Sequence, residues 1–370
     1  MKIGFTLDAL KSMTGKERVV YELVKFLSSG HEITIITFKN KVNDDILKEF
    51  EKLGVRFFFL IYPGAIKGRL MYLTSYKEKI SNLKLDVINA HGLILSNAAS
   101  LSSIPTVKTY HAHVISKEEF FSNPLRWFDY YLEESFSIYF SKMVISISNY
   151  AKNQLKTMYG RDSIVIPNGV DIKLFKPNKI LREEFRNKFR FSEDEIVIGY
   201  VARFVPQKNH LLLLKIARRL PRNVRIIFVG EGKLEEKYRY LVYKLGMKRK
   251  IIFLKKLTNK DLAAFYNGID IYAHPSFWES FGLPLLEAQS SGKPTIAFDK
   301  TAMREVILNN KTGFLVKNDK EFEEYLSFLI NNEKIRRIFG RNASEFSKNF
   351  DWNKICKKYE KVFKRVVGIG

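Results

Sequence analysis

The sequence HPSFWESFGLPLLEA occupies residues 274–288, and the rest of the chain can be organised around it. The apolar run Ile269–Ala273 just before it is typical of a buried strand. Pro284 suits the first turn of a helix, so the pattern predicts a strand, a loop and a helix. Glu279 then lies in the loop, and Glu287 lies about one turn into the helix.

Backbone amides between these two carboxylates could bind an anion. Ser280, Phe281, Gly282 and Leu283 lead into the helix, and free N–H groups at a helix start attract phosphate. Carboxylates beside a phosphate would repel it unless each of them binds hydroxyl groups. A nucleotide sugar offers a diphosphate flanked by ribose and sugar hydroxyls. The simpler alternative is an acidic pair that only stabilises the helix dipole.

Length and composition indicate a folded protein of two domains. A chain of 370 residues is long for one core, and 46% hydrophobic residues exclude a disordered chain. We expect no transmembrane helix and no signal peptide. The single cysteine, Cys356, excludes an internal disulfide and a cysteine-built zinc site. A cytoplasmic protein is therefore expected.

The net charge of +24 could serve nucleic acid, an anionic membrane surface or phosphorylated substrates. No zinc-finger spacing or RNA-binding signature is present in the sequence. Many basic residues fall on what we expect to be a solvated helix face, namely Lys354, Lys357, Lys358, Lys361 and Lys364. Charge alone does not choose among the three partners.

The first half of the chain predicts a parallel α/β sheet. Apolar runs predict strands at residues 3–7, 33–36, 57–60, 86–89, 106–110, 143–146 and 164–166, with a first helix at 17–27. Ligands gather beyond the carboxyl ends of such strands, where His91 and His111 fall. His91 is an acceptor-side candidate. His111 and His113 could ligate a metal, but no carboxylate accompanies them and we expect none.

Two segments of the first half have more than one reading. Aromatic residues crowd segment 120–140, where core packing is the simplest explanation and an acceptor groove or a membrane-contacting face is the alternative. Segment 69–79 mixes Arg69, Lys77 and Lys79 with apolar residues and is similar to a basic amphipathic surface.

A second α/β series follows a turn at 167–171 and a polar segment at 176–178, which we interpret as a linker. Strands are expected at residues 196–201, 225–230, 251–254, 269–273, 294–298 and 314–316. Arg203 and Lys208 come directly after the first of these strands. A planar guanidinium and a point charge there suit a diphosphate. Together with the Glu279–Glu287 segment, they predict a nucleotide-sugar site.

The sequence resembles the retaining glycosyltransferases of family four. The family signature is a glutamate, seven residues and a second glutamate, which Glu279 to Glu287 match, with Ala288 following. Arg203 and Lys208 match the family's basic pair, and His111 matches its histidine. Further matches are Pro167–Asp171, Val229–Gly232, Gly292–Ala297 and Thr312–Val316. The resemblance covers nearly the whole chain.

The resemblance implies an α/β protein with the GT-B fold, in which two Rossmann-like parallel-sheet domains face each other across a cleft. Residues 1–168 would form the acceptor-binding domain and residues 169–350 the nucleotide-sugar-binding domain. Residues 351–370 would form a helix that crosses back to the N-terminal domain. Apolar positions at helical spacing in this last segment are Trp352, Ile355, Tyr359, Val362 and Phe363.

The resemblance also implies residue roles. Arg203 and Lys208 would bind the diphosphate and stabilise the leaving group. Glu279 would bind the donor sugar, and Glu287 the ribose. Donor-binding residues would also include Gly15, Ser280, Phe281, Gly282 and Leu283, with His111 near the reacting centre.

The implied reaction is sugar transfer with retention, without a metal or a cofactor. The donor would be a nucleoside diphosphate sugar and the acceptor a glycan, a protein or a lipid-linked sugar, with an anionic membrane surface as a further partner and no nucleic acid. Two alternatives are a nucleoside-diphosphate-sugar 2-epimerase on the same fold, which would act on the donor alone, and a basic nucleic-acid-binding protein, which would show salt-sensitive DNA binding.

Three positions depart from the family pattern. Thr14 precedes Gly15 where paired glycines are frequent. Lys255 stands where a glycine is common, and residues 300–303 replace a glycine-rich turn. The last two departures leave the identities of the base and the sugar open.

Overall fold

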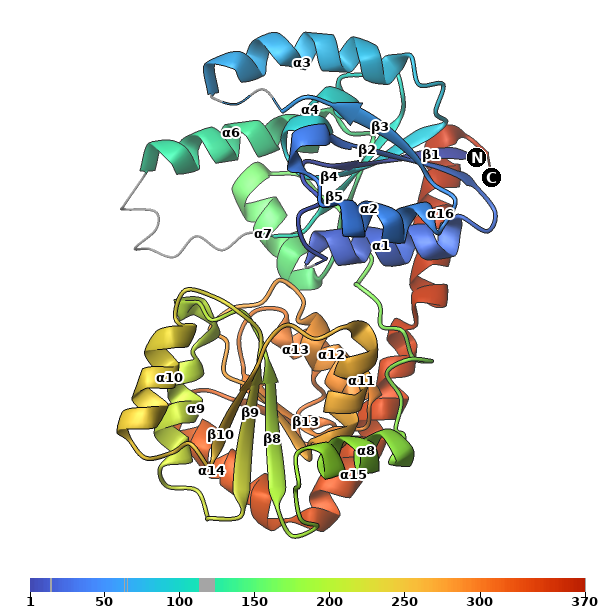
Figure 1. Ribbon diagram of the computed structural model, residues 1–370. Helices are drawn as coiled ribbons and strands as arrows, with labels where there is room; N and C mark the ends of the chain where they lie inside the picture. The colour runs from blue at the N-terminus through green and yellow to red at the C-terminus, as the bar shows by residue number, and fades with distance from the viewer. Residues whose placement is uncertain (14, 63, 65, 113–123, 370) are drawn as a thin grey trace. The chain divides into compact units, whose positions relative to one another are not determined.

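The computed structural model describes residues 1–370 except 14, 63, 65, 113–123 and 370, and it does not describe the side chains of 66–71 and 124–129. The chain divides into two compact units (Figure 1). Unit 1 comprises Met1–Asn168 together with Trp352–Gly370, and unit 2 comprises Gly169–Asp351. Each unit is an α/β domain with its own parallel sheet.

Unit 1 is built on a seven-stranded parallel sheet in the order β3-β2-β1-β4-β5-β6-β7. Its strands are β1 (Lys2–Leu7), β2 (Glu32–Phe38), β3 (Arg56–Leu60), β4 (Val87–His91), β5 (Thr106–Tyr110), β6 (Met143–Ser146) and β7 (Ile164–Val165). Its described helices are α1 (Lys16–Leu27), η1 (Lys39–Lys41), α2 (Asp44–Glu51), α3 (Ile66–Ser81), α4 (Ile94–Ser100), α6 (Pro124–Phe140), α7 (Asn149–Tyr159) and α16 (Trp352–Val367).

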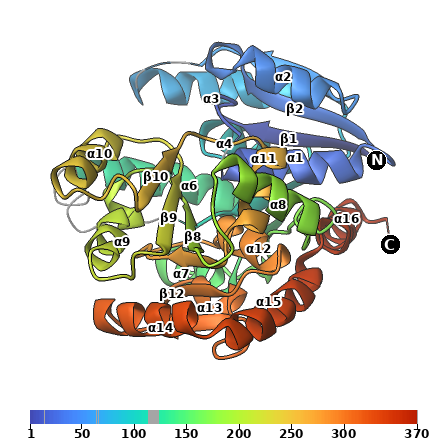
Figure 2. The ribbon, with the colours of Figure 1, turned by 60° about the horizontal axis from the view of Figure 1, so that its bottom comes forward.

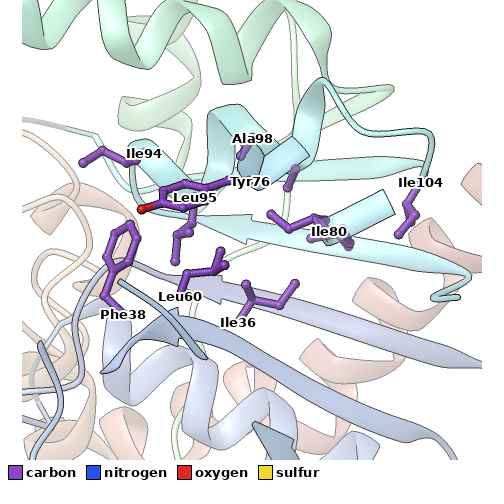
Figure 3. Close-up of a cluster of buried hydrophobic side chains, with 11 residues drawn as sticks. Ile36, Phe38, Leu60, Tyr76, Ile80, Ile94, Leu95, Ala98 and Ile104 are labelled. Atoms are coloured by element: carbon purple, nitrogen blue, oxygen red, sulfur yellow. The ribbon is translucent and has the colours of Figure 1, made fainter. Parts of the chain in front are cut away.

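Apolar side chains on β2, β3 and β4 pack beneath α3 and α4 (Figure 3). The cluster consists of Ile36, Phe38, Leu60, Tyr76, Ile80, Ile88, Ile94, Leu95, Ala98, Ala99 and Ile104. Burying such side chains contributes roughly 1.5–3 kcal/mol each. The near-continuous apolar strands expected from the sequence are thus covered by helices, as parallel sheets require.

Unit 2 repeats this plan with a six-stranded parallel sheet in the order β10-β9-β8-β11-β12-β13 (Figure 2). Its strands are β8 (Ile196–Val201), β9 (Val224–Val229), β10 (Ile251–Leu254), β11 (Ile271–His274), β12 (Thr295–Phe298) and β13 (Gly313–Val316). Its helices are α8 (Lys179–Lys188), η2 (Pro206–Lys208), α9 (His210–Ala217), α10 (Glu235–Lys244), α11 (Asn259–Gly268), α12 (Leu283–Ser290), α13 (Met303–Val306), α14 (Asp319–Asn331), α15 (Glu333–Ser347) and η3 (Lys348–Phe350).

In both sheets the strand order reverses beside the first strand of the unit. The reversal lies between β1 and β4 in unit 1, and between β8 and β11 in unit 2. At such a point the helices that follow the two strands diverge to opposite faces of the sheet. The resulting crevice at the carboxyl ends of the strands is where open α/β sheets bind ligands.

The segment interpreted from sequence as a linker packs on unit 2. Phe175 is buried and its ring lies 5.8 Å from that of Tyr266. Asn267 accepts a hydrogen bond from the Asn178 amide at 2.7 Å and donates to the Lys176 carbonyl at 3.1 Å. These contacts fix the polar segment on unit 2.

The last helix, α16, is amphipathic as the sequence predicted. Its apolar positions, Trp352, Ile355, Cys356, Tyr359, Val362, Phe363 and Val366, are buried, and it packs against α1, β4 and β5 of unit 1. The lysines expected on a solvated face, Lys354, Lys357, Lys358, Lys361 and Lys364, are exposed. The interpretation of these lysines as a solvated helix face is confirmed.

Two features of α6 bear on the aromatic segment. Tyr131 is partly buried and stacks on Tyr159 with 4.9 Å between ring centroids. Phe136, Tyr139 and Phe140 are exposed. Core packing therefore explains only one side of this helix, and residues 113–123 lie outside the described chain. Among the helices described, none combines the length and apolar character needed to cross a membrane.

His210, the first residue of α9, is an ionisable side chain in the core of unit 2. It is fully buried against Phe204 and Tyr200, with ring centroids 4.3 Å and 4.8 Å away. Both ring nitrogens lack a hydrogen-bond partner among the described residues. Burial, with a smaller effect of Lys208, lowers the pKa of His210 to about 3.

We predict that His210 makes unfolding more favourable in acid. The unfolded chain protonates this ring below its ordinary pKa of about 6.5 and the folded chain does not, so stability is complete above that pH and falls as the pH drops. The loss from this ring is about 2 kcal/mol between about pH 7 and about pH 5. As the pH is lowered, the calorimetric melting temperature of His210→Phe should fall less steeply than that of the parent chain. Equal slopes would contradict this assignment.

Candidate active site

Lys208 and Glu279, two of the residues singled out from sequence, meet beside the strand-order reversal of unit 2. Arg203 lies two residues beyond β8, and Lys208 ends η2 in the same loop. Glu279 lies in the loop between β11 and α12. Because β8 and β11 are parallel neighbours, both loops leave the same edge of the sheet. We refer to Arg203, Lys208, Glu279, Glu287 and the amides of residues 281–283 as the candidate donor site.

A chain of three polar side chains lies at the centre of this site. The Lys208 ammonium donates to Glu279 Oε1 at 2.6 Å. The same oxygen lies 2.8 Å from His274 Nε2. His274 is fully buried, and its Nδ1 lies 3.4 Å from the Tyr272 hydroxyl. Glu279 is therefore fixed by a cation on one side and an imidazole on the other.

Electrostatics keep Glu279 ionised. Burial alone would raise the pKa of the Glu279 carboxyl, but Lys208 and the His274 hydrogen bond outweigh burial and hold this pKa well below its ordinary value. Burial lowers the pKa of His274 more than the hydrogen bond to Glu279 raises it. The ring is therefore neutral at neutral pH, and we infer the tautomer that donates to Glu279 through Nε2–H.

The loop that carries Lys208 is held by hydrogen bonds from β8 and from the loop after β11. The Tyr200 hydroxyl donates to the Lys208 carbonyl at 2.7 Å and lies 3.0 Å from the Ser276 hydroxyl. The Phe277 amide donates to the Gln207 carbonyl at 3.0 Å. Together these bonds tie the loop after β8 to the loop after β11.

Arg203 differs from Lys208 in being free. Its side chain is exposed and forms no hydrogen bond or ion pair with any described residue. Gly230 packs against this loop, since a Cβ atom at Gly230 would lie 2.2 Å from the Ala202 carbonyl oxygen, and its φ of 144° also favours glycine. The loop is thus packed closely, while the guanidinium remains available for an anion.

The start of α12 presents unoccupied amides, as expected from sequence. The N–H groups of Phe281, Gly282 and Leu283 donate to no group in the described chain. Gly282 is the N-cap with a φ of 94°, a left-handed conformation that a side chain would strain. A helix start with free N–H groups carries partial positive charge and binds phosphate. Ser280, the remaining donor-binding candidate, precedes these amides in the same loop.

Glu287 lies on the buried face of α12. It is 3% exposed, and its Oε2 accepts a hydrogen bond from the Tyr266 hydroxyl at 2.9 Å. This bond orients the carboxylate from α11. The predicted role of Glu287, binding the ribose hydroxyls, stays a prediction.

Unit 1 contains a second polar chain, at the carboxyl ends of the neighbouring strands β4 and β5. His91, the last residue of β4, is fully buried, with Nε2 2.7 Å from Asn89 Oδ1 and Nδ1 2.9 Å from His111 Nε2. The Asn89 amide nitrogen already donates to Val107 and Thr109, so its oxygen must accept from His91. His91 then accepts from His111, because burial holds its pKa well below the ordinary value and keeps it neutral.

In this chain His111 Nε2 is the donor to His91 Nδ1. His91 is buried behind His111, so it orients that ring, and the acceptor-side role predicted for His91 stays a prediction. Gly15 is exposed at the N-cap of α1 with a φ of 55°. His113 and Thr14 lie outside the described residues. Within the described chain, no three His, Cys, Asp or Glu side chains gather as metal ligands.

Sequence reasoning missed three residues of these sites: His274, Tyr266 and Asn89. From the sequence, His274 is only the residue that follows the strand expected at 269–273, and Tyr266 has no assigned role. Each contributes through a contact with a residue distant in the sequence or on a neighbouring strand. The available signal was a polar group at the carboxyl end of a buried strand, which applied to His274 and Asn89.

Comparison with known proteins identifies the family. Residues 13–174 match the family described as glycosyltransferase family 4, and residues 181–346 match the one described as glycosyl transferases group 1. Among curated relatives, an uncharacterized glycosyltransferase of Methanocaldococcus jannaschii, MJ1178, is 28% identical over 78% of this chain and 78% of its own length. The D-inositol 3-phosphate glycosyltransferase of Corynebacterium glutamicum is 32% identical over 52% of this chain and 49% of its own.

Solved structures show the same fold. The Anabaena protein Alr3699/HepE, solved in complex with UDP and glucose, superposes with a TM-score of 0.83 at 21% identity, over 99% of this chain and 100% of its own. The two parallel-sheet units therefore form the GT-B fold expected from the sequence. The two family matches and this fold together show that the chain is a glycosyltransferase and belongs to glycosyltransferase family 4.

Proposed function

We propose that this glycosyltransferase moves a sugar from a nucleoside diphosphate sugar to a hydroxyl acceptor, with retention at the anomeric carbon and without a metal. The observation that carries the proposal is the Lys208–Glu279 ion pair beside the free amides of α12. It combines a cationic phosphate site with an ionised carboxylate that can accept from sugar hydroxyls. Arg203 adds an exposed cation at the same strand ends.

The contacts of Lys208, Glu279 and Arg203 support a separate proposed role for each of them. Lys208 has three N–H donors, one of which is engaged by Glu279, so the others can meet phosphate oxygens. Glu279 uses Oε1 for Lys208 and His274, which leaves Oε2 for a sugar hydroxyl. Arg203 and the α12 amides would neutralise the charge that develops on the leaving diphosphate, the role a metal ion has elsewhere.

The proposed chemistry is a front-side substitution. The bond between the anomeric carbon and the diphosphate oxygen breaks, and the acceptor oxygen bonds to the same face of that carbon. The acceptor hydroxyl proton passes to the departing phosphate oxygen. The anomeric configuration is therefore kept, with no covalent intermediate on the protein.

A UDP-linked donor is the first to test, because the similar Anabaena protein was solved with UDP and glucose. Calorimetric titration with UDP, GDP and ADP identifies the base, and an acceptor screen with the matching sugar nucleotide follows. Turnover that requires an acceptor supports transfer. Conversion of the donor alone into an isomeric donor would support a 2-epimerase instead.

The acceptor and the location in the cell are part of this proposal. A lipid-linked sugar or a glycan at the cytoplasmic face of a membrane agrees with two exposed surfaces of unit 1. One is the lysine face of α16, and the other is the set of exposed apolar residues of α6, namely Leu132, Phe136, Tyr139 and Phe140. Both surfaces suit an anionic lipid surface.

Removing the Arg203 guanidinium should lower the catalytic rate without a matching loss of stability. Arg203→Ala is expected to lower kcat/KM by about 100-fold or more, because it removes a charge aimed at the leaving group. Steady-state kinetics and the UDP dissociation constant measure the effect. Arg249→Ala is the matched control and should keep parent-like values, because Arg249 is also exposed in unit 2 and pairs with no described residue. Parent-like turnover of Arg203→Ala would remove this residue from the site.

The Tyr266 hydroxyl should affect donor binding through Glu287. Tyr266→Phe removes the hydrogen bond at 2.9 Å and should raise the UDP dissociation constant by roughly 3- to 10-fold, a typical cost for one such bond. Tyr240→Phe, at an exposed tyrosine of α10, serves as the control. If both variants bind UDP equally well, Tyr266 does not orient Glu287 for the nucleotide.

Stereochemistry provides a separate test of the mechanism. Proton NMR of the first product formed should show the same anomeric configuration as the donor sugar, because attack and departure take place on one face. A product of opposite configuration would contradict front-side substitution, even if donor binding is as proposed.

A further inference from the structure

A cavity of about 480 Å³ opens in unit 2 at the opposite ends of the strands from the candidate donor site. It is lined by the start of α8, the end of α11, the residues after α12 and the last turns of α15. The candidate donor site follows strand ends, whereas Asp270 and Lys293, beside this cavity, precede β11 and β12. The cavity therefore lies at the amino ends of the strands. Helices α8 and α15, which contribute to the lining, are labelled in Figure 2.

Positive charge dominates the lining. Arg182, Lys293, Arg341 and Lys179 all line the cavity, and Glu345 is the single carboxylate among its lining residues. Glu345 forms an ion pair with Lys348, and Lys179 forms one with Glu183. Asp270, behind the lining, is shared by Arg182 at 2.6 Å and Arg186 at 3.2 Å. One carboxylate thus faces two guanidinium groups, which leaves a positive excess.

Lys293 is the cation least matched by the protein. Its ammonium donates to the Asn267 carbonyl at 2.9 Å, and no carboxylate of the described chain lies within ion-pair distance. Burial, followed by the charge of Arg182, lowers the pKa of Lys293 to about 7. An anion in the cavity would favour the charged form of this lysine.

Two further groups are free to bind a ligand. Ser291 lines the cavity, is 1% exposed, and has a hydroxyl with no hydrogen-bond partner in the described chain. A buried hydroxyl without a partner is uncommon and costs stability. Arg341 is exposed and forms no ion pair with any described residue. A hydroxyl donor and a free guanidinium facing one cavity are the groups that phosphate oxygens need.

The helix ends at the cavity also favour an anion. The ten-residue helix α8 begins at Lys179, so its positive end opens on the cavity. The last turn of α12 points its carbonyls to the same edge. Those carbonyls are occupied, because Glu287, Ala288 and Gln289 accept hydrogen bonds from the amides of residues 291–293. The negative end of α12 is thereby covered.

We propose that this cavity is a second anion site, which binds the phosphate group of a small phosphate ester through Ser291, Lys293 and Arg341. A lone phosphate would leave much of 480 Å³ unfilled, whereas a small ester fits the range of ligand pockets. The site is independent of the donor and does not depend on the function proposed above.

The test is thermal stabilisation, measured without nucleotide and again with excess UDP, the first nucleotide to test under the proposed function. Glycerol 3-phosphate and inorganic phosphate are each titrated at constant ionic strength. The ester should raise the melting temperature in a saturable way and at lower concentration than phosphate. Lys293→Met and Arg341→Ala should each lower the ester affinity by about tenfold, the cost of a charged hydrogen bond.

Lys334→Ala, at an exposed lysine earlier on α15, is the matched control and should respond as the parent does. A cooperative melting transition of each variant without ligand reports that it is folded, and the Arg341→Ala variant keeps the test informative if Lys293→Met does not fold. Stabilisation by phosphate with no preference for the ester would overturn the ester assignment. No saturable stabilisation, or an unchanged response in Lys293→Met and Arg341→Ala, would overturn the site.

Discussion

The ion pair between Lys208 and Glu279 is the interaction on which the candidate donor site depends. A carboxylate that is largely removed from water is costly unless a cation and hydrogen bonds compensate it, and here Lys208 and His274 share one oxygen of Glu279. The pair also joins the loop after β8 to the loop after β11. Charge, position and loop geometry are therefore set together, before any ligand binds. Such preorganisation is what stabilisation of a developing charge requires.

The parallel sheets explain why these loops meet. Each unit reverses its strand order next to its first strand. The helices that follow the two strands at this point go to opposite faces of the sheet, so the loops at the strands' carboxyl ends have no helix between them. In unit 1, the parallel pairing of β4 with β5 places His91 and His111 together at the carboxyl ends of these two strands. Both polar chains use a neutral buried histidine to orient a second residue. One plan thus produces two ordered groups, one in each unit.

The strands and the position of the candidate donor site could be predicted from sequence, but the pairing within the site could not. Apolar runs gave all the expected strands within a few residues of the observed bounds, because buried parallel strands need them. Lys208 and Glu279 are 71 residues apart, and only the register of β8 beside β11 brings them together. Lys108 is another feature that the sequence does not predict. Lysine side chains are usually exposed, but that of Lys108 is only 1% exposed.

Helix α12 has a consequence for engineering. The free amides of residues 281–283 belong to the front of this helix, while Ser291 closes its far end. Eight residues span about 12 Å, which exceeds the roughly 7–10 Å over which substitutions usually influence one another. Substitutions near residues 281–283 that alter donor preference and substitutions near Ser291 that alter the positive charge of the cavity should therefore have additive effects on free energy. The helix acts as a short spacer that lets the two ends be altered separately.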